Sequence, residues 1–283
     1  IVRQKIADLA ATLKEVSDGN VPHLVGLCEI GDEPTGHRLA LELGGGVFKA
    51  CCAGIRPYVS QTGLMMLYDP EVFRVHAHRS GPASLVERTK WLAVELEVKA
   101  ASAGRFWFVV NHWKSKLGAP LWVTEQSRVA SAQEVGDFFM SVARLSSDAM
   151  VLAGDFNCEP FERPFSGVAH TTRIVAVRER PQVLNLRNRL PYCYNAMWRW
   201  LGEPDPCEVE RGRGPAYVRP RPLGTYVANA KKRLGWRMLD QLLVTKRVLS
   251  GGSVLLVENS IRVAPPQNDC TDHHAIGVTF EYS

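Results

Sequence analysis

The sequence contains no long apolar segment. None of its hydrophobic runs approaches the roughly 18 residues that a membrane-spanning helix requires. The N-terminus also lacks the basic and apolar regions of a signal peptide. These absences predict a cytoplasmic protein. Because the chain begins at Ile1, without Met and inside a predicted helix, we also expect an N-terminal segment to be missing.

Regularly spaced cysteine pairs are absent as well. The 7 cysteines are an odd number, and they include neither a CxxC pair nor the spacing of a disulfide framework. This pattern argues against a structural zinc site and favours reduced thiols.

Neither charge sign dominates the composition. The formal net charge of +5 favours a polyanionic partner without requiring one. Hydrophobic residues make up 46% and charged residues 22% of the 283 positions, as in ordinary globular proteins. Since no shift in composition divides the chain, we expect a single domain over residues 1–283.

Hydrophobic periodicity predicts helices alternating with strands in the first half of the chain, and mostly strands and loops thereafter. The predicted helices are residues 1–16, 35–43 and 125–145. The predicted strands are residues 25–30, 63–68, 72–78, 90–98, 105–110, 149–153 and 275–280. The strands at 90–98 and 105–110 are close enough in sequence to form an antiparallel hairpin.

The stretch from Ala149 to Asn157 is the most informative. A short apolar run, which predicts a strand buried on both faces, ends at Gly154 and is followed by Asp155, Phe156 and Asn157. In extended backbone, Asp155 and Asn157 would point to one side as a pair of oxygen ligands, and Phe156 to the other. The alternative is an Asx turn in which both polar side chains bond to nearby backbone. Taken alone, these residues favour the turn.

Acidic residues accompany two further apolar runs. Glu29 lies in the predicted strand 25–30, and Asp272 and His273 precede the predicted strand 275–280. Carboxylates at three strand ends predict one shared site and not an isolated turn.

These segments, together with Asn111 to Ser115 and Leu239 to Gln241, resemble the endonuclease/exonuclease/phosphatase family in identity and order. The family includes deoxyribonuclease I, abasic-site endonucleases, sphingomyelinases and inositol-polyphosphate phosphatases. The resemblance runs from about Ile1 to Phe280, and its most specific parts are residues 154–157 and 271–273.

The resemblance implies an α/β fold, a four-layer sandwich of two mixed β-sheets packed face to face and flanked by helices. It also implies that the family's first strand, which carries an Asn of the site, precedes Ile1. The implied activity is hydrolysis of phosphodiester bonds with Mg²⁺ or Mn²⁺, metals that oxygen-rich ligand sets prefer.

The resemblance also implies roles for individual residues. The implied metal ligands are Glu29, Asp155, Asn157, Asp272 and His273. The implied catalytic residues are His112, Asp155, Asn157, Asp240 and His273. Asp240 would hydrogen-bond His273 and fix its tautomer, and His112 would act as a second imidazole. No acid near Gln61 and Thr62 is available to support His112.

Several of these residues also have an ordinary structural interpretation. Glu29 could be a surface carboxylate at a strand end, and Asp240 could pair with Arg237 or Lys246. Strand alternation would direct His274 away from His273, so we expect His274 to be structural.

The stretch from Arg211 to Arg237 carries eight Lys or Arg residues and no acid, with Tyr217, Tyr226 and Trp236 between them. Basic side chains neutralise phosphates and aromatic rings stack on bases, so this mixture suits a nucleic-acid groove. The alternative is a solvated basic loop. The predicted substrate contacts are Arg88, Lys114, Ser115, Arg219, Arg221, Tyr226, Lys231, Lys232, Arg233 and Trp236.

The sequence therefore predicts a metal-dependent nuclease acting on DNA or RNA. One alternative is a phosphatase or phospholipase-type hydrolase of a small or lipid phosphate. Another is a catalytically inactive module that binds nucleic acid, against which the many clustered acids argue because they repel one another without a metal.

Overall fold

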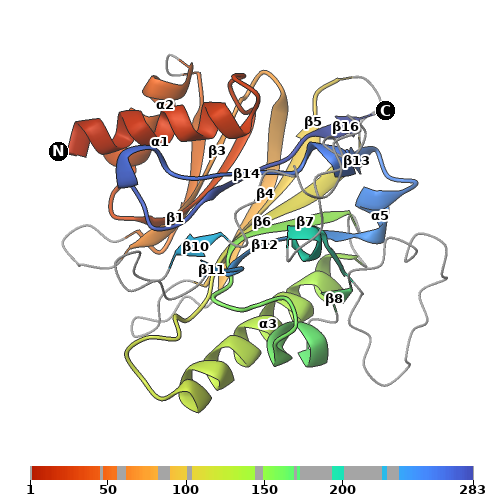
Figure 1. Cartoon of the computed structure of the whole chain (residues 1–283). Coiled ribbons are helices and arrows are strands. Elements are labelled where there is room, and N and C mark those ends of the chain that lie inside the picture. Colours follow the sequence, from red (N-terminus) through yellow and green to blue (C-terminus); the bar gives the residue numbers. More distant parts are fainter. Residues whose placement is uncertain are drawn as a thin grey trace, which may run out of the picture.

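Two groups of strands pack face to face, and helices cover both outer surfaces (Figure 1). The computed structural model describes residues 2–44, 47–55, 62–81, 90–100, 104–143, 149–168, 171–172, 193–200, 225–227 and 236–282. Two of the helices, α1 and α2, lie on one side of the strands in Figure 1, and the long helix α3 lies on the opposite side.

The larger sheet is mixed and has seven strands in the order β4-β5-β6-β7-β12-β9-β8. Its strands are β4 (Phe73–Gly81), β5 (Trp91–Val98), β6 (Arg105–His112), β7 (Met150–Asp155), β12 (Asp240–Thr245), β9 (Cys193–Asn195) and β8 (Thr171–Thr172). β6 and β7 are parallel, and β12 is antiparallel to β7. α3 (Leu121–Ala143) connects β6 to β7, as a parallel pair requires. The ends of β6 and β7 and the beginning of β12 therefore meet at one edge of the sheet.

The other side of the sandwich is built from shorter ladders. Its three-stranded sheet has the order β1-β3-β2, and two-stranded ladders join β13 to β16 and β14 to β15. These strands are β1 (Leu24–Ile30), β2 (Lys49–Ala53), β3 (Gly63–Tyr68), β13 (Val254–Leu256), β14 (Arg262–Ala264), β15 (Ala275–Gly277) and β16 (Phe280–Tyr282). The predicted single strand over 275–280 is wrong, because the chain changes pairing partner between β15 and β16.

In the described part of the chain, the remaining elements are two helices on the outer surface and several short pieces. The helices are α1 (Val2–Val16) and α2 (Glu33–Gly44). The short pieces are α5 (Lys246–Leu249), the ladder of β10 (Tyr226–Val227) with β11 (Trp236–Arg237), a π-helical turn (Pro164–Val168), and 3₁₀ turns (Ala196–Trp200, Glu258–Ser260 and Gln267–Asp269). The three predicted long helices are confirmed, although α3 begins earlier than its hydrophobic pattern indicates. Among the described residues, no helix is both long and apolar enough to cross a membrane.

Side-chain alternation divides the core into layers. Val151 of β7 packs between the sheets with Leu64 of β3 and Leu92 of β5. Its neighbours Met150 and Leu152 face α3 instead. β7 is therefore buried on both faces, as its apolar sequence predicts. A third cluster packs α1 and α2 against the outer face of β1 and β3.

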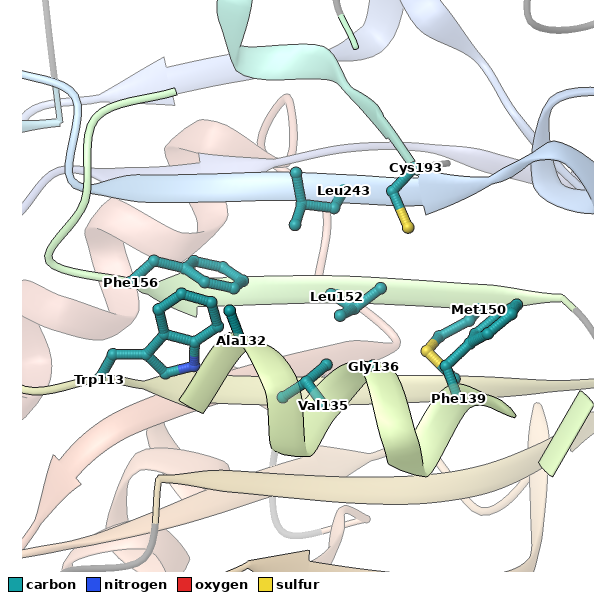
Figure 2. Close-up of a pocket in the computed structure, with 10 residues that line it drawn as sticks. All are labelled: Trp113, Ala132, Val135, Gly136, Phe139, Met150, Leu152, Phe156, Cys193 and Leu243. Atoms are coloured by element: carbon teal, nitrogen blue, oxygen red, sulfur yellow. The ribbon is translucent and has the colours of Figure 1, made fainter. Parts of the chain in front are cut away.

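The layer under α3 contains a gap in its packing (Figure 2). It is lined by Trp113, Ala132, Val135, Gly136, Phe139, Met150, Leu152, Phe156, Cys193 and Leu243. These walls are core side chains without a charged group, so the gap has no means of holding a phosphate. We assign it to packing and not to catalysis.

Phe156 joins this core to the end of β7. Its side chain is fully buried, with ring centroids 4.8 Å from Trp113 and 5.3 Å from Phe165. We expect Phe156→Ala to lower the free energy of unfolding by about 3–5 kcal/mol, because a cavity replaces the ring. Phe161, which is 59% exposed, provides the control. Phe161→Ala should change stability by less than about 0.5 kcal/mol in the same denaturant titration, and equal effects would contradict this account of the core.

Candidate active site

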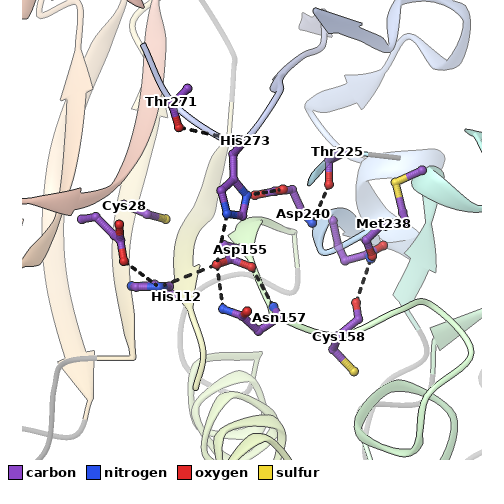
Figure 3. A network of polar contacts seen from close by, with 12 residues as sticks. Cys28, His112, Asp155, Asn157, Cys158, Thr225, Met238, Asp240, Thr271 and His273 are labelled. Carbon is purple, nitrogen blue, oxygen red and sulfur yellow. Dashed lines mark hydrogen bonds and ion pairs between the residues drawn. The ribbon is translucent and has the colours of Figure 1, made fainter. Parts of the chain in front are cut away.

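Three polar side chains lie in a row across neighbouring strands of the larger sheet. The strand registers pair His112 of β6 with Asp155 of β7, and Asp155 with Asp240 of β12. Side chains at directly paired positions point to the same face of a sheet. Sheet pairing thus gathers residues that are far apart in the sequence, and Figure 3 shows them converging on Asp155.

The chain turns sharply after Asp155. β7 ends at this residue, and Asn157 has a left-handed φ of 49°. The backbone N–H of Asn157 donates to Asp155 Oδ1 (2.8 Å), and its Nδ2 donates to Asp155 Oδ2 (2.7 Å). The predicted extended backbone from 155 to 157 is therefore wrong, because the Asx turn forms. The turn nevertheless brings the two side chains into contact.

Gly154 is required for this turn. Its φ is 126°, and a Cβ atom there would lie 2.2 Å from the carbonyl oxygen of Asn111. The close approach of β6 and β7 at this point leaves no room for a side chain. Asn157 Nδ2 also donates to the carbonyl of Trp113 (3.1 Å), so the loops that follow both strands are joined directly beside Asp155.

Asp240 and His273 form the closest ionisable pair of the site. The distance from His273 Nδ1 to Asp240 Oδ2 is 2.7 Å, so the hydrogen bond predicted from the sequence is present. The opposite ring nitrogen, Nε2, lies 4.0 Å from Asp155 Oδ2. Burial lowers the pKa of His273, but the hydrogen bond with Asp240 and the charges of Asp240, Asp155 and Asp272 outweigh burial and raise that pKa to about 9.

The carboxyl group of Asp155 has a strongly raised pKa. Burial is the largest cause, and with the negative charges of Asp240 and Glu29 it raises the pKa of Asp155 from 3.8 to about 7. The charge of His273 and the backbone N–H of Asn157 act in the opposite direction. The site thus holds more negative charge than its own cations neutralise.

Glu29 reaches the site from the other side of the sandwich. Its φ is 59°, and the register of β1 against β3 shifts between Leu27 and Ile30. Bulged, left-handed positions of this kind redirect a side chain out of the ladder. His112 Nε2 lies 3.7 Å from Glu29 Oε1 and 3.6 Å from Asp155 Oδ2. His112 therefore has two acidic neighbours, although neither comes from the segment near Thr62.

One group of ligand atoms that could hold a metal ion consists of Asp155, Asp240 and His273. In the described part of the chain, one ligand atom from each lies within 4.8 Å of the others. The sequence predicts Asp240 only as a partner of His273, so its place in this group was missed. Asp272 is exposed and outside the group, and acts on His273 through its charge. Carboxylates in excess beside one imidazole fit a hard divalent cation.

The predicted substrate contacts are placed only in part. Lys114 is exposed, and its carbonyl accepts from Arg128 Nη1 (3.2 Å). Ser115 Oγ accepts from the backbone N–H of Leu117 (3.2 Å), so this hydroxyl completes a local turn. Tyr226 and Trp236 lie in the β10-β11 ladder, with only their backbone described. The predicted contacts outside the described residues are Arg88, Arg219, Arg221, Lys231, Lys232 and Arg233.

The two raised pKa values predict how the stability of the metal-free protein depends on pH. Asp155 rises from 3.8 to about 7 and His273 from 6.5 to about 9, so the folded state binds both protons more tightly than the unfolded state. The contribution of each group to the free energy of unfolding is complete below the pKa of that group in the unfolded state. It is lost as the pH rises through the pKa of the group in the folded state. We expect the free energy of unfolding to fall as the pH is raised from 5 to 9, measured in urea with EDTA. In His273→Gln, the part of the fall that comes from His273 should disappear, and the part that comes from Asp155 should move to higher pH because the charge of His273 lowers the pKa of Asp155. A pH-independent wild type would contradict the assignment.

Comparison with known proteins agrees with this architecture. A family model described as the endonuclease/exonuclease/phosphatase family matches residues 2–199. The structure is similar to the human Nocturnin catalytic domain with bound sulfate, which is 15% identical (98% of this chain and 87% of that chain covered, TM-score 0.57). It is also similar to truncated Caenorhabditis elegans TDP2 (15% identical, 100% and 91% covered, TM-score 0.59) and to a Bacteroides thetaiotaomicron mannosyl-6-phosphatase (11% identical, 99% and 91% covered, TM-score 0.59).

No curated protein sequence matches the chain. The structural similarities, at such low identity, show the fold alone. The family model covers well over half of the chain and is therefore decisive. The chain belongs to the endonuclease/exonuclease/phosphatase family, whose enzymes hydrolyse phosphoesters with the help of a divalent metal ion.

Proposed function

We propose that this protein is a Mg²⁺- or Mn²⁺-dependent phosphodiesterase that cleaves nucleic acid, either DNA or RNA. The observation that carries the catalytic part is the row of His112, Asp155 and Asp240, with His273 bonded to its end. The basic and aromatic residues between Arg211 and Arg237 support a polynucleotide substrate.

The metal would be held mainly by carboxylates. Asp240 is engaged by His273 Nδ1, so we assign the metal to Asp155 and Glu29, with Asp272 as a third carboxylate. Asn157 donates to Asp155 from its backbone N–H and from Nδ2, and Nδ2 also donates to the carbonyl of Trp113. The amide oxygen of Asn157 accepts no hydrogen bond among the described residues, so we propose it as a further oxygen ligand. When bound, the ion would neutralise negative charge on the oxygens of the scissile phosphate.

The protein's own side chains would orient the attacking water, accept its proton and donate hydrogen bonds to the phosphate. Asp155, fixed by the turn to Asn157, would orient the attacking water and accept its proton at Oδ2. His273, with Nδ1–H donating to Asp240, would present Nε2–H to a non-bridging phosphate oxygen. His112, which lies between Glu29 and Asp155, would donate from Nε2 to the phosphate or to the leaving oxygen.

A second candidate is a phosphatase acting on a small phosphate. The similarity to a mannosyl-6-phosphatase over 99% of this chain favours it, because the same fold there carries a sugar-phosphate activity. The two candidates share the site and differ in what surrounds it. An inactive binding module has less support, because the buried carboxyl of Asp155 and its charged neighbours cost stability without a metal.

The test is cleavage of a labelled substrate panel by the purified chain. The panel contains single- and double-stranded DNA, RNA, a phosphoinositide and mannose 6-phosphate, each with Mg²⁺, with Mn²⁺ and with EDTA. We expect polynucleotide cleavage that requires metal and is lost in Asp155→Ala. Phosphate release from a small substrate without polynucleotide cleavage would favour the phosphatase, and binding of nucleic acid without any cleavage would favour the inactive module.

The contribution of the basic stretch is tested separately. Replacing residues 231–233, Lys-Lys-Arg, by three glutamines should raise the KM for polynucleotide and flatten its salt dependence, because phosphate contacts are lost. The matched control replaces the exposed residues Arg3, Lys5 and Arg38, on α1 and α2, by glutamine. Equal effects of the two triple variants would mean that only the net charge matters.

A further inference from the structure

We propose that Thr225 is a positioning residue that fixes the Asp240–His273 pair. Thr225 is fully buried and bonds to both of the segments that supply this pair. The catalytic consequence of this proposal rests on the proposed function, whereas the geometric consequence does not.

The hydrogen bonds of Thr225 reach three places. Its Oγ1 accepts from the backbone N–H of Asp240 (2.9 Å), and its carbonyl accepts from the backbone N–H of His274 (2.7 Å). Its own N–H donates to the carbonyl of Arg237 (2.9 Å). Figure 3 shows Thr225 directly beside Asp240, on the side away from the ring of His273. Asp240 and His273 are thus each held within one residue of a bond to Thr225.

This link matters because the two catalytic segments belong to different ladders. Asp240 begins β12 of the seven-stranded sheet, whereas His273 precedes β15, which pairs with β14. The distance from His273 Nδ1 to Asp240 Oδ2 is therefore set by how the two ladders lie relative to each other. Thr225 connects them through one side-chain bond and one backbone bond, and only the side-chain bond can be removed by substitution.

A purely structural role is the alternative. The buried backbone N–H of Asp240 needs an acceptor. In this alternative, the hydroxyl of Thr225 only satisfies that N–H and has no effect on the position of the Asp240 side chain. The chain provides a matched comparison in Thr245, at the other end of the same strand. Thr245 is also buried, and its Oγ1 accepts from the backbone N–H of Met150 (2.9 Å). The two threonines make the same kind of bond, but only Thr225 makes it beside the site.

The experiment compares Thr225→Val, Thr225→Ser and Thr245→Val in the full chain. Valine removes the hydroxyl and keeps the shape, and serine restores the hydroxyl. On the substrate that wild type cleaves best in the panel, we expect Thr225→Val to lower kcat by about 10- to 100-fold with little change in KM, because the catalytic groups are misplaced. Thr225→Ser should recover most of this loss. Thr245→Val should lower the Tm to a similar extent and leave kcat within about twofold.

A second measurement does not depend on activity. In metal-free protein, the Nδ1–H proton of His273 bonded to Asp240 should give a downfield NMR resonance, assigned by its loss in His273→Gln. We expect this resonance to shift or vanish in Thr225→Val and to persist in Thr225→Ser and Thr245→Val.

The outcomes separate the two proposals. An unchanged resonance in Thr225→Val, equal kcat losses in both valine variants, or no rescue by serine would overturn the positioning role. A wild type that cleaves nothing in the panel would overturn the proposed function. The NMR resonance would still decide whether Thr225 holds the Asp240–His273 pair in place.

Discussion

Replacing Asp155 by asparagine is expected to lower kcat at least about 10³-fold while the protein remains folded. Asn157 N–H, His112 and His273 all converge on the Asp155 carboxylate, so the substitution removes the charge at the point where these contacts meet. Asparagine keeps the shape and one acceptor oxygen. The measurement is steady-state cleavage of the best panel substrate with saturating metal, accompanied by thermal unfolding followed by circular dichroism.

Asp155→Asn should raise the Tm although it lowers kcat. In metal-free protein above pH 7, wild type carries an ionised carboxylate that burial and Asp240 disfavour, and Asp155→Asn removes that cost. Asp137→Asn is the control, because Asp137 is exposed on α3 and contacts only Gln133 among the bonds described for its side chain. It should change neither kcat nor Tm appreciably. Retention of kcat within tenfold in Asp155→Asn would remove Asp155 from the catalytic role.

The strand ends that carry the site could be predicted because their chemistry is local. An apolar run that stops at Gly154 and continues with Asp155 indicates both the buried strand and the polar group at its end, and the structure has both. The hydrogen bond between Asp240 and His273 was predicted through the family resemblance. The spacing of the two residues along the chain does not require this hydrogen bond, because they belong to different ladders.

The details of the turn could not be read from alternation. Every second side chain lies on the same face only while the backbone stays extended, and the left-handed φ of Asn157 ends the extended conformation. Similarly, the apolar run 275–280 looks continuous in the sequence, but β15 and β16 pair with different strands. Strand pairing is a property of partners distant in the sequence, and no local pattern records where a partner ends.

Glu29 and Thr225 show a second limit. One of the two acidic neighbours of His112 is Glu29, which reaches the site through a bulge in β1 and does not belong to the segment near Thr62. Thr225 is an uncharged residue within the stretch from Arg211 to Arg237, where the basic and aromatic residues carry the sequence interpretation. Its importance appears only when bonds to Asp240 and His274 are seen together. Positioning groups of this kind have no distinctive residue type, so the sequence alone does not indicate them.

The Asp240–His273 pair predicts strong non-additivity in a double-mutant cycle. We expect Asp240→Asn and His273→Gln each to lower kcat by about 10²- to 10⁴-fold, and the double variant to be no worse than His273→Gln alone. The reason is that Asp240 acts on the reaction through the His273 ring, because its Oδ2 lies 2.7 Å from Nδ1 and leaves Nε2 directed at Asp155. Without that ring, Asp240 has nothing to orient.

The same pair gives the cycle a spectroscopic check. Burial lowers the pKa of His273, and the hydrogen bond and charge of Asp240 are the main causes that raise it to about 9. Removing the Asp240 charge leaves burial less opposed, so the pKa of His273 should fall in Asp240→Asn, as followed by NMR titration of metal-free protein. His274, whose pKa burial lowers, is a neighbouring ring that Asp240 affects in the same direction but without a hydrogen bond to it, and its shift should be smaller. Additive kcat losses together with an unmoved His273 pKa would show that Asp240 acts independently, most simply as a metal ligand within the Asp155, Asp240 and His273 group.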